Sequence, residues 1–249
     1  MHRFRFATFA AVAVIGFASV ASAADLPTKA PVYKAPVVTV YNWSGCYIGL
    51  NAGGGWTQTE FTNTVNTTAF GHLNPGESFS YTNSGFIGGG QVGCNYQINQ
   101  WVLGVEGTLA GTTIKGDATN LAILNDDVFT TKINSLGTVT ARIGYAWNNV
   151  LLYAKGGYAG ANVQFSVSDT VGPNFGAGSQ TRWQSGWMVG GGFEYGLTPN
   201  WIIGAEYNYI DLGTANYEVG GGSSVGSYAF DVRTRISTVL ARLSYKFGP

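Results

Sequence analysis

The strongest constraint on the fold is a repeated alternation of apolar and polar residues, which divides the chain from Trp43 onward into eight segments. Side chains of a β-strand point alternately to its two faces, so a period of two predicts strands rather than helices. An all-β fold of antiparallel strands is therefore expected. The predicted strands cover residues 43–56, 84–97, 101–113, 133–147, 150–164, 183–196, 200–212 and 231–247.

The connections between these segments alternate between short and long. Short turns lie at 98–100, 148–149 and 197–199, and long loops rich in Asn, Thr, Ser and Gly lie at 57–83, 114–132, 165–182 and 213–230. Short turns on one side and long loops on the other are typical of an outer-membrane barrel, with the turns in the periplasm and the loops outside the cell. The sequence thus predicts an eight-stranded antiparallel up-and-down transmembrane β-barrel with short periplasmic turns and four long extracellular loops.

The composition favours strands that face lipid. Only 10% of the 249 residues are charged and 14% are aromatic, whereas charged residues make up about a quarter of a typical soluble domain. Beyond the signal-like N-terminus no apolar stretch approaches the length of a membrane helix, so contact with lipid would have to be made by strands. The content of large apolar residues also argues against a disordered chain.

Six charged residues lie within the predicted membrane-crossing parts of the strands, and alternation places them on one face. Glu206, for example, has the opposite parity to Trp201, Ile203 and Tyr207. Because a basic side chain that faces lipid at mid-depth costs about 2 to 4 kcal/mol, this face is predicted to line the barrel interior. The six residues are Glu106, Arg142, Lys155, Glu194, Glu206 and Arg242.

Closing each hairpin symmetrically about its loop gives candidate partners for these charges. The predicted ion pairs are Glu106 with Arg142, Glu206 with Arg242, and Lys155 with Glu194. An eight-stranded barrel has an interior just wide enough for side chains to fill, so these pairs predict a plug rather than a wide pore. The plug would also contain Tyr47, Asn51, Gln91 and Tyr153. The alternative, a soluble sandwich with solvated charges, would need a core that carries Trp and Tyr on every strand.

Aromatic residues recur at the short-turn ends of the strands. Amphipathic rings at one level of a barrel suit the boundary with lipid headgroups, so they predict a periplasmic girdle. The alternative is that aromatic residues and glycines occur in the strands of any β-protein. The predicted girdle consists of Trp43, Tyr96, Trp101, Tyr145, Trp147, Tyr195, Trp201, Tyr245 and Phe247.

The stretch GFIGGGQVGCNY at residues 85–96 contains the G-x-G-x-x-G spacing of a dinucleotide-binding loop in Gly88, Gly90 and Gly93. Such a loop precedes a helix whose N-terminus faces the pyrophosphate. The residues that follow here have neither helical spacing nor good helix formers. Glycines on both faces of this segment instead indicate tight barrel curvature and lumenal room for large neighbouring side chains.

Cys46 and Cys94 have outward parity on neighbouring predicted strands, each a few residues from the short-turn end. In an exported chain both thiols meet an oxidising compartment, so they could form a bond. A cross-strand disulfide is one hypothesis, and two free thiols are the other, because directly opposite positions often have imperfect geometry for the bond.

The first residues have the pattern of an export signal. A basic n-region, an apolar region at 6–20 and the small residues Ala21-Ser22-Ala23 predict a signal peptide over 1–23, with an uncleaved anchor as the alternative. Residues 24–42 carry repeated Lys-Ala-Pro and predict an extended periplasmic linker, so the barrel is expected to occupy 43–249. Loss of the signal would leave 11 of the 13 basic residues against 13 acidic ones, with no basic patch for nucleic acid.

Four stretches carry a family resemblance: WSGCYIGLNAG at 43–53, GFIGGGQVG at 85–93, EYNYIDLG at 206–213 and LSYKF at 243–247. Together they resemble the small outer-membrane β-barrel proteins of alphaproteobacteria, a group of surface immunogens and haemin-binding proteins with an OmpA-like barrel that is often labelled a porin family. The resemblance implies insertion into the outer membrane of a Gram-negative cell by the barrel assembly machinery. Its assembly signal would be Leu243, Tyr245 and Phe247, although Gly248 and Pro249 depart from the family by following the terminal aromatic residue.

The expected function is that of a non-enzymatic structural barrel, a monomer among outer-membrane lipids and lipopolysaccharide that supports the envelope and displays its loops without metal or cofactor. A second hypothesis, implied by the resemblance, is a surface receptor for haemin. Haem iron is commonly bound by His or Tyr, and His72 and Tyr81 are the candidates on a loop. A third hypothesis is a narrow channel opened by rearranging the lumenal pairs. A fourth is an acyl-transfer enzyme that uses His72, Glu77 and Ser78.

Overall fold

A computed structural model describes residues 41–64, 76, 78–118, 127–169, 178–219 and 228–248, and their regular secondary structure is all β-strand. Within these ranges no helix combines the length and hydropathy that a membrane span requires. The predicted signal peptide and nearly all of the predicted linker lie outside the described residues; only Tyr41 and Asn42 of the linker belong to them.

The described residues form nine strands. In chain order these are β1 (Gly45–Asn63), β2 (Ser78–Ile98), β3 (Trp101–Thr112), β4 (Lys115–Ala118), β5 (Asp127–Trp147), β6 (Val150–Asp169), β7 (Gly178–Gly196), β8 (Trp201–Val219) and β9 (Tyr228–Phe247). β3 and β4 both pair with β5 and are separated only by Thr113 and Ile114, so together they make one strand of the barrel.

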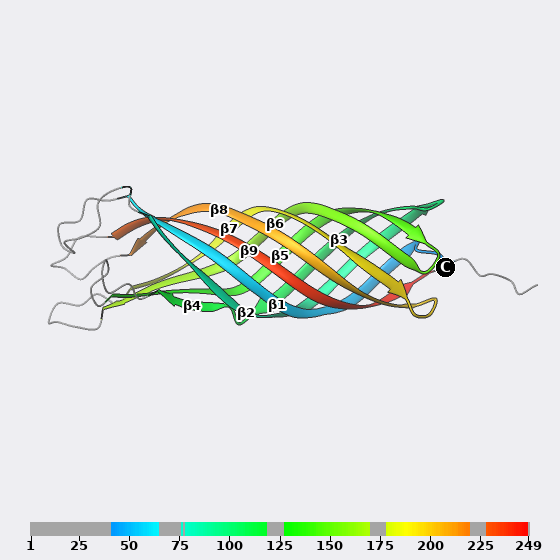
Figure 1. The fold of residues 1–249 in the computed structure, drawn as a ribbon, viewed down its shortest axis with the longest axis horizontal. Coiled ribbons are helices and arrows are strands. Elements are labelled where there is room, and N and C mark those ends of the chain that lie inside the picture. The colour runs from blue at the N-terminus through cyan, green and yellow to red at the C-terminus, as the bar shows by residue number, and fades with distance from the viewer. Residues whose placement is uncertain are drawn as a thin grey trace, which may run out of the picture. The chain divides into compact units, whose positions relative to one another are not determined.

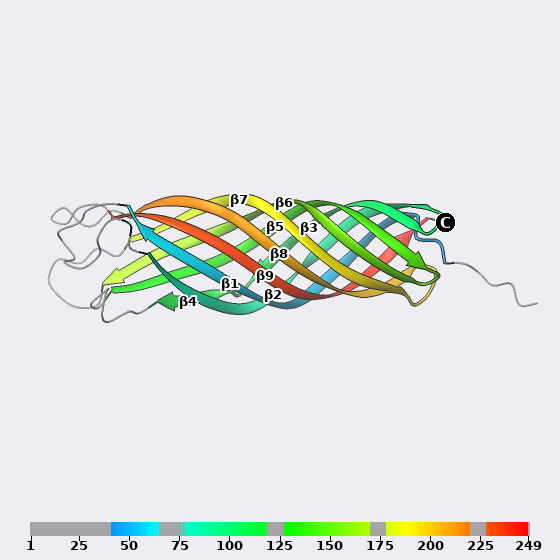
Figure 2. The same ribbon diagram turned by 45° about the horizontal axis from the view of Figure 1, so that its top comes forward.

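All neighbouring strands pair antiparallel, and the sheet closes on itself. The first strand of the order, β3, also pairs with β5, and β1 pairs with β9 as well as with β2. Closure leaves no sheet edge, which allows a β-structure to sit in hydrocarbon. Figures 1 and 2 show the same tilted strands running around the barrel in both views, with the short turns at the end nearer the C-terminus. The predicted eight-stranded antiparallel barrel is confirmed.

The strands continue further toward the long loops than predicted. β1 reaches Asn63 instead of residue 56, and β8 reaches Val219 instead of residue 212. Polar runs such as Thr57–Thr62 look like loop in the sequence, yet their backbone pairs with both β2 and β9. Beyond the lipid both faces of a strand can be polar, so alternation disappears while the hydrogen-bonded ladder continues. The predicted loops 57–83, 114–132, 165–182 and 213–230 are therefore too long.

Two of the short turns depend on asparagine. Asn99 and Asn148 both have a φ of 54°, a left-handed conformation that Asn tolerates better than most residues. Each begins a connection of two residues, between β2 and β3 and between β5 and β6. These tight connections hold neighbouring strands in register at the periplasmic end.

The outer wall of the barrel is apolar, whereas the interior contains charged and polar side chains as well as apolar clusters. Leu50 and Leu109 are 68% and 75% exposed, while Glu106 and Arg142 on the opposite face are 2% and 3% exposed. A soluble protein rarely exposes so much contiguous apolar surface, whereas a membrane barrel needs such a band against lipid. Glycine provides room inside: a Cβ on Gly93 would lie 2.5 Å from the Tyr47 hydroxyl.

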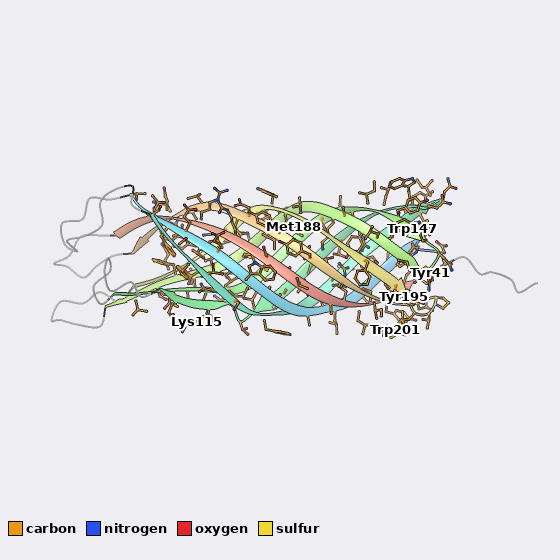
Figure 3. The ribbon with its side chains drawn as sticks, viewed as in Figure 1. Tyr41, Lys115, Trp147, Met188, Tyr195 and Trp201 are labelled. Atoms are coloured by element: carbon orange, nitrogen blue, oxygen red, sulfur yellow. A yellow bond between two sulfur atoms is a disulfide. The ribbon has the colours of Figure 1, made fainter. Side chains whose placement is uncertain are left out.

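Aromatic side chains ring the outer wall at two levels. Figure 3 shows Trp147, Tyr195 and Trp201 at the short-turn end of the barrel, as predicted for the periplasmic girdle. Trp43, which was predicted to belong to this girdle, is fully buried inside the barrel. A second set of outward aromatic residues, which the sequence reasoning missed, lies further toward the loops and consists of Trp56, Tyr158, Trp183, Trp187 and Tyr207.

Candidate functional site in the barrel lumen

Six buried charges meet in one cluster at the centre of the lumen. Three are carboxylates and three are bases, so the cluster is formally neutral, and each side chain is at most 4% exposed. We call it the lumenal charge cluster; its members are Glu106, Arg142, Lys155, Glu194, Glu206 and Arg242. They project from β3, β5, β6, β7, β8 and β9, so the cluster connects most of the barrel wall.

Glu106 is the hub of the lumenal charge cluster because it contacts all three bases. Its carboxylate oxygens lie 3.5 Å from Arg142 Nη1 and 3.0 Å from Lys155 Nζ, and Arg242 also donates to both of them. Tyr47 completes the set by donating its hydroxyl to Glu106 Oε2 over 2.6 Å. The free-energy cost of removing this carboxylate from water is offset only while these partners remain.

The other two carboxylates take complementary positions. Glu194 accepts two parallel bonds from Arg142, of 3.1 Å and 2.8 Å, in the bidentate arrangement that suits a guanidinium. Glu206 accepts from Lys155 Nζ at 2.8 Å and also pairs with Arg242. Every base in the cluster therefore contacts at least two carboxylates.

Two tyrosines link the acids to the bases. Tyr47 donates to Glu106 and accepts a bond of 2.9 Å from Arg142. Tyr153 donates to Glu206 over 2.7 Å and accepts one of 3.1 Å from Arg242. The guanidinium carbon of Arg142 also lies 3.9 Å from the centre of the Tyr153 ring, a cation–π contact. Hydroxyls that donate and accept in this way fix the rotamers of the surrounding charges.

Two of the three predicted ion pairs are present in the structure. Glu106 contacts Arg142 and Glu206 contacts Arg242, each diagonally across its hairpin and two residues from the directly opposite position. The prediction that Lys155 pairs with Glu194 is wrong. The β6–β7 register places Lys155 opposite Gly190 and Glu194 opposite Leu151. The predicted register, which placed Lys155 opposite Glu194, was therefore shifted by four residues.

Polar and apolar side chains fill the lumen around the charges. Asn51 donates to Gln91 over 2.8 Å, and Gln91 donates to Ser244 over 3.0 Å. A cavity of about 20 Å³ borders Asn51, Lys155 and Glu206, which is room for roughly one water molecule. The cavity also borders a packed apolar cluster that extends toward the long loops. Its members are Ile87, Ala110, Ile114, Ile133, Leu136, Ala159, Ala161, Val163, Met188, Ile210, Leu212, Ile236 and Leu240.

Trp43 closes the periplasmic end of the lumen. Its indole N–H donates to the Asn148 carbonyl over 3.0 Å, and its ring packs against the Tyr41 ring at 4.7 Å between centroids. Lys246 faces inward as well and donates to the carbonyl of Asn42. Burial, with a smaller effect from Glu194, raises the pKa of Tyr41 to about 12, so its hydroxyl stays neutral at physiological pH. We call Tyr41, Asn42 and Trp43 the periplasmic plug.

The plug could have been found from parity alone. Trp43 shares the inward parity of Tyr47 and Asn51, whereas a girdle residue must have outward parity. Its contacts form a buried cluster with residues from several strands: Val102, Ala146, Leu151, Tyr153 and Ile202. The residues just before the first strand thus belong to the interior of the barrel.

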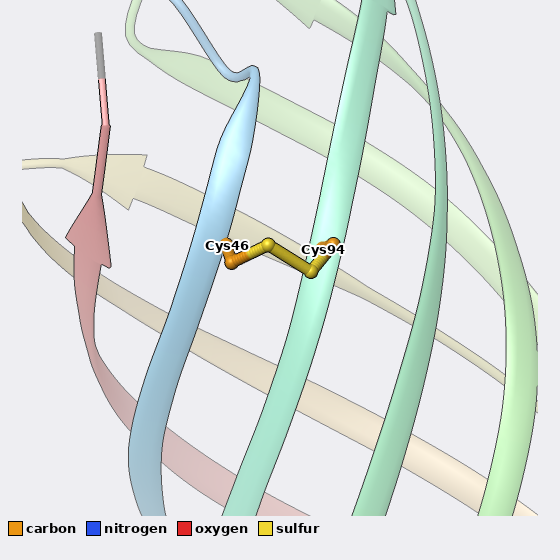
Figure 4. The surroundings of a disulfide bond; sticks show 2 residues. All are labelled: Cys46 and Cys94. Carbon is orange, nitrogen blue, oxygen red and sulfur yellow. A yellow bond between two sulfur atoms is a disulfide. The ribbon is translucent and has the colours of Figure 1, made fainter.

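Cys46 and Cys94 lie directly opposite each other on β1 and β2 and form a disulfide (Figure 4). Both residues are on the outer face, near the periplasmic end of their strands. The bond joins residues 48 positions apart, so it closes the whole first hairpin, including the residues between β1 and β2.

Replacing both cysteines with alanine is expected to lower the free energy of unfolding by about 2 to 4 kcal/mol, because the bond restricts the unfolded chain. Urea titration in lipid vesicles, followed by the mobility of unboiled samples on a gel, measures the change. Reductant should destabilise the wild-type protein and leave the Cys46→Ala/Cys94→Ala variant unchanged. Complete alkylation of both thiols in the absence of reductant would contradict the bond.

The remaining predicted site residues have mixed outcomes. His72 and Glu77 lie outside the described residues. Tyr81 was predicted on a loop but lies in β2, with its ring stacked on Phe61 at 5.5 Å and its hydroxyl donating to Thr131 over 2.7 Å. The predicted assembly signal is on the outer face of β9, where the side chains alternate outward at Leu243, Tyr245 and Phe247.

A closed antiparallel barrel with an apolar wall, aromatic girdles and a filled interior defines an integral outer-membrane protein. The chain belongs to the outer membrane protein beta-barrel domain family, whose sequence model matches residues 10–247. The predicted family and outer-membrane location are thereby confirmed.

Named relatives agree with this assignment. The chain is 33% identical to the 31 kDa outer-membrane immunogenic protein of Brucella melitensis biotype 1, over 93% of this chain and 95% of that protein. It is 29% identical to the 22 kDa outer membrane protein of Rhizobium leguminosarum bv. viciae, over 78% and 76% of the two chains. The outer membrane protein OprG of Pseudomonas aeruginosa aligns with a TM-score of 0.49 and 14% identity, over 84% of this chain and 98% of that one.

Proposed function

We propose that the protein is a non-enzymatic, non-conducting structural barrel of the outer membrane that supports the envelope and displays its loops. The filled lumen is the observation that carries this proposal. From the periplasmic plug, through the lumenal charge cluster, to the apolar cluster around Met188, the described interior is packed with side chains. The small cavity beside Lys155 accommodates about one water molecule and no larger solute.

The energetics of the lumen oppose a gated channel. An ion that crossed the barrel would have to displace Glu106, Arg142 and Arg242 from one another, and separating a buried charge from its partners costs about 3 to 5 kcal/mol each time. It would then have to pass the tightly packed apolar cluster, whose side chains leave no room for its hydration shell and do not replace it. The packing therefore favours a rigid wall over a pathway.

Planar-bilayer recordings are expected to show no conductance steps from the wild-type protein. Insertion must be verified independently, by the fast mobility of the unboiled protein recovered from the same vesicles, and an open porin treated in parallel serves as the positive control. Reproducible single-channel steps from inserted wild-type protein would refute the sealed lumen.

The envelope role is tested separately in cells. A strain that lacks the gene is expected to become more sensitive to detergent and to large antibiotics, and the wild-type gene should restore resistance. A variant with shortened loops but an intact barrel should restore it equally if the barrel itself provides the support. Restoration that depends on the loops would instead point to a receptor.

The haemin hypothesis stays a prediction. It now rests on His72, because the Tyr81 hydroxyl is already hydrogen-bonded inside the barrel. Adding haemin to the purified barrel and recording the Soret band tests it: a shift that disappears in a His72→Ala variant would support a receptor.

A further inference from the structure

The outer wall contains an apolar groove of about 850 Å³ that the sealed lumen does not explain. Its floor is formed by outward-facing glycines on three neighbouring strands, Gly90 on β2, Gly107 on β3 and Gly137 on β5. Branched side chains form the walls, among them Val92 and Leu109. The groove faces the hydrocarbon of the membrane because its residues lie on the exposed apolar face.

The strand register shows how the groove runs. One row of outward residues follows the hydrogen-bonding direction from β8 to β6 and consists of Trp201, Tyr245, Ile48, Val92, Gly107, Val139 and Tyr158. The adjacent row contains Leu243, Leu50, Gly90, Leu109 and Gly137 in the same order of strands. Glycines in both rows on β2, β3 and β5 hollow out the wall between them. The groove thus crosses the membrane band obliquely.

Packing does not require Gly90 or Gly107, whereas a Cβ on Gly137 would lie 3.3 Å from Leu109 Cδ2. A Cβ on Gly107 would have no neighbour closer than 3.9 Å, and one on Gly90 would meet its nearest atom at 3.6 Å, both ordinary contacts. By contrast, a Cβ on the inward-facing Gly89 would lie 2.1 Å from the Leu109 carbonyl oxygen. Glycine weakens a strand when nothing demands it. Gly90 and Gly107 therefore keep open a space that a side chain could have filled.

The two ends of the groove are chemically distinct from its middle. At the loop-side end the indole N–H of Trp183 donates to the Tyr158 hydroxyl over 3.1 Å, and that hydroxyl lies 2.8 Å from Ser185 Oγ. At the other end Trp201 and Tyr245 belong to the periplasmic girdle, with their rings 5.1 Å apart. A ligand in the groove would therefore be apolar along its length and meet hydroxyl groups at the level of the outer leaflet.

We propose that this groove binds one long, unbranched acyl chain of a membrane lipid, whose polar end lies at Tyr158 and Ser185. Lipid tails are the apolar molecules that surround this face of an outer-membrane barrel. The row from Trp201 to Tyr158 crosses six strand-to-strand spacings, or about 29 Å. Because barrel strands tilt by about 35 to 45°, this oblique row rises about 17 to 21 Å along the barrel axis. Half of the hydrocarbon core is only about 15 Å thick, so the groove favours a chain longer than one leaflet.

The matched variants are Gly107→Leu and Gly111→Leu, on the same strand and the same face. A leucine at Gly107 fills the floor of the groove. Gly111 lies outside the groove and has no heavy atom within 4 Å of the position of a Cβ. Both variants should fold, which is verified by the fast mobility of unboiled samples. The control therefore adds the same apolar side chain to the same wall without blocking the site.

The probe is a phospholipid with a photoreactive group near the end of a long acyl chain, incorporated into phosphatidylethanolamine vesicles with the intact protein. Cross-links mapped by mass spectrometry are expected to concentrate on β2, β3 and β5. They should fall about tenfold in Gly107→Leu and stay unchanged in Gly111→Leu, and a probe chain of one-leaflet length should label these strands less. Labelling spread evenly over all outward faces, or unaffected by Gly107→Leu, would mean ordinary surrounding lipid and overturn the proposal.

Discussion

Replacing Glu106 with glutamine is expected to lower the free energy of unfolding by about 3 to 5 kcal/mol, the largest effect of any single charge removal in the lumen. Glu106 contacts all three bases of the lumenal charge cluster and accepts the Tyr47 hydroxyl. Its loss leaves three cations with two carboxylates in a site sealed from water. Urea unfolding in lipid vesicles, followed by gel mobility, measures the change.

The control for this variant is Asp117→Asn, which removes a carboxylate from a solvent-exposed pair. The Lys115–Asp117 contact is 3.8 Å long, and both side chains are at least half exposed, so its loss should change stability by less than about 1 kcal/mol. A second variant, Glu106→Gln/Arg242→Gln, restores the balance of charge and should recover part of the lost stability. Equal stability of wild type and Glu106→Gln would show that the cluster does not hold the lumen together.

Truncating Trp43 to alanine is expected to destabilise the barrel by about 3 to 5 kcal/mol, because a fully buried ring is replaced by a cavity. The ring fills the periplasmic end of the lumen and holds Asn148 in the turn between β5 and β6. The same urea titration measures the effect. The matched control is Trp147→Ala, whose ring is 55% exposed on the outer wall. The interpretation fails if both variants lose equal stability.

Alternation was enough to predict the barrel and which charges face inward. The period of two is a direct consequence of strand geometry, so Glu106 and Arg142 could be placed inside without knowing any contact. Parity also placed Cys46 and Cys94 on the same face of neighbouring strands, where they lie directly opposite each other and form the disulfide. Strand ends on the loop side could not be predicted, because outside the lipid alternation is no longer needed.

Contacts across the lumen could not be predicted from the registers of the separate hairpins. A hairpin register gives neighbours on adjacent strands, but Arg242 on β9 meets Glu106 on β3, and Lys155 on β6 meets Glu206 on β8. These meetings depend on how far the closed sheet is sheared and on the reach of each side chain. The sequence therefore predicted three separate pairs, whereas the molecule has one connected cluster. Trp43 was misplaced for a different reason, since its aromatic character was given more weight than its parity.

The equal number of acids and bases in the lumenal charge cluster restricts how this barrel can diverge. Any single replacement that removes a charge, at Glu194 for instance, passes through an ancestor in which a buried charge has lost its partner and water cannot screen it. Such an ancestor would be a poor competitor unless a base changed soon afterwards. The six residues should therefore be inherited as a block or exchanged in matched acid–base steps, while outward positions away from the disulfide, the aromatic girdles and the groove can exchange among apolar side chains.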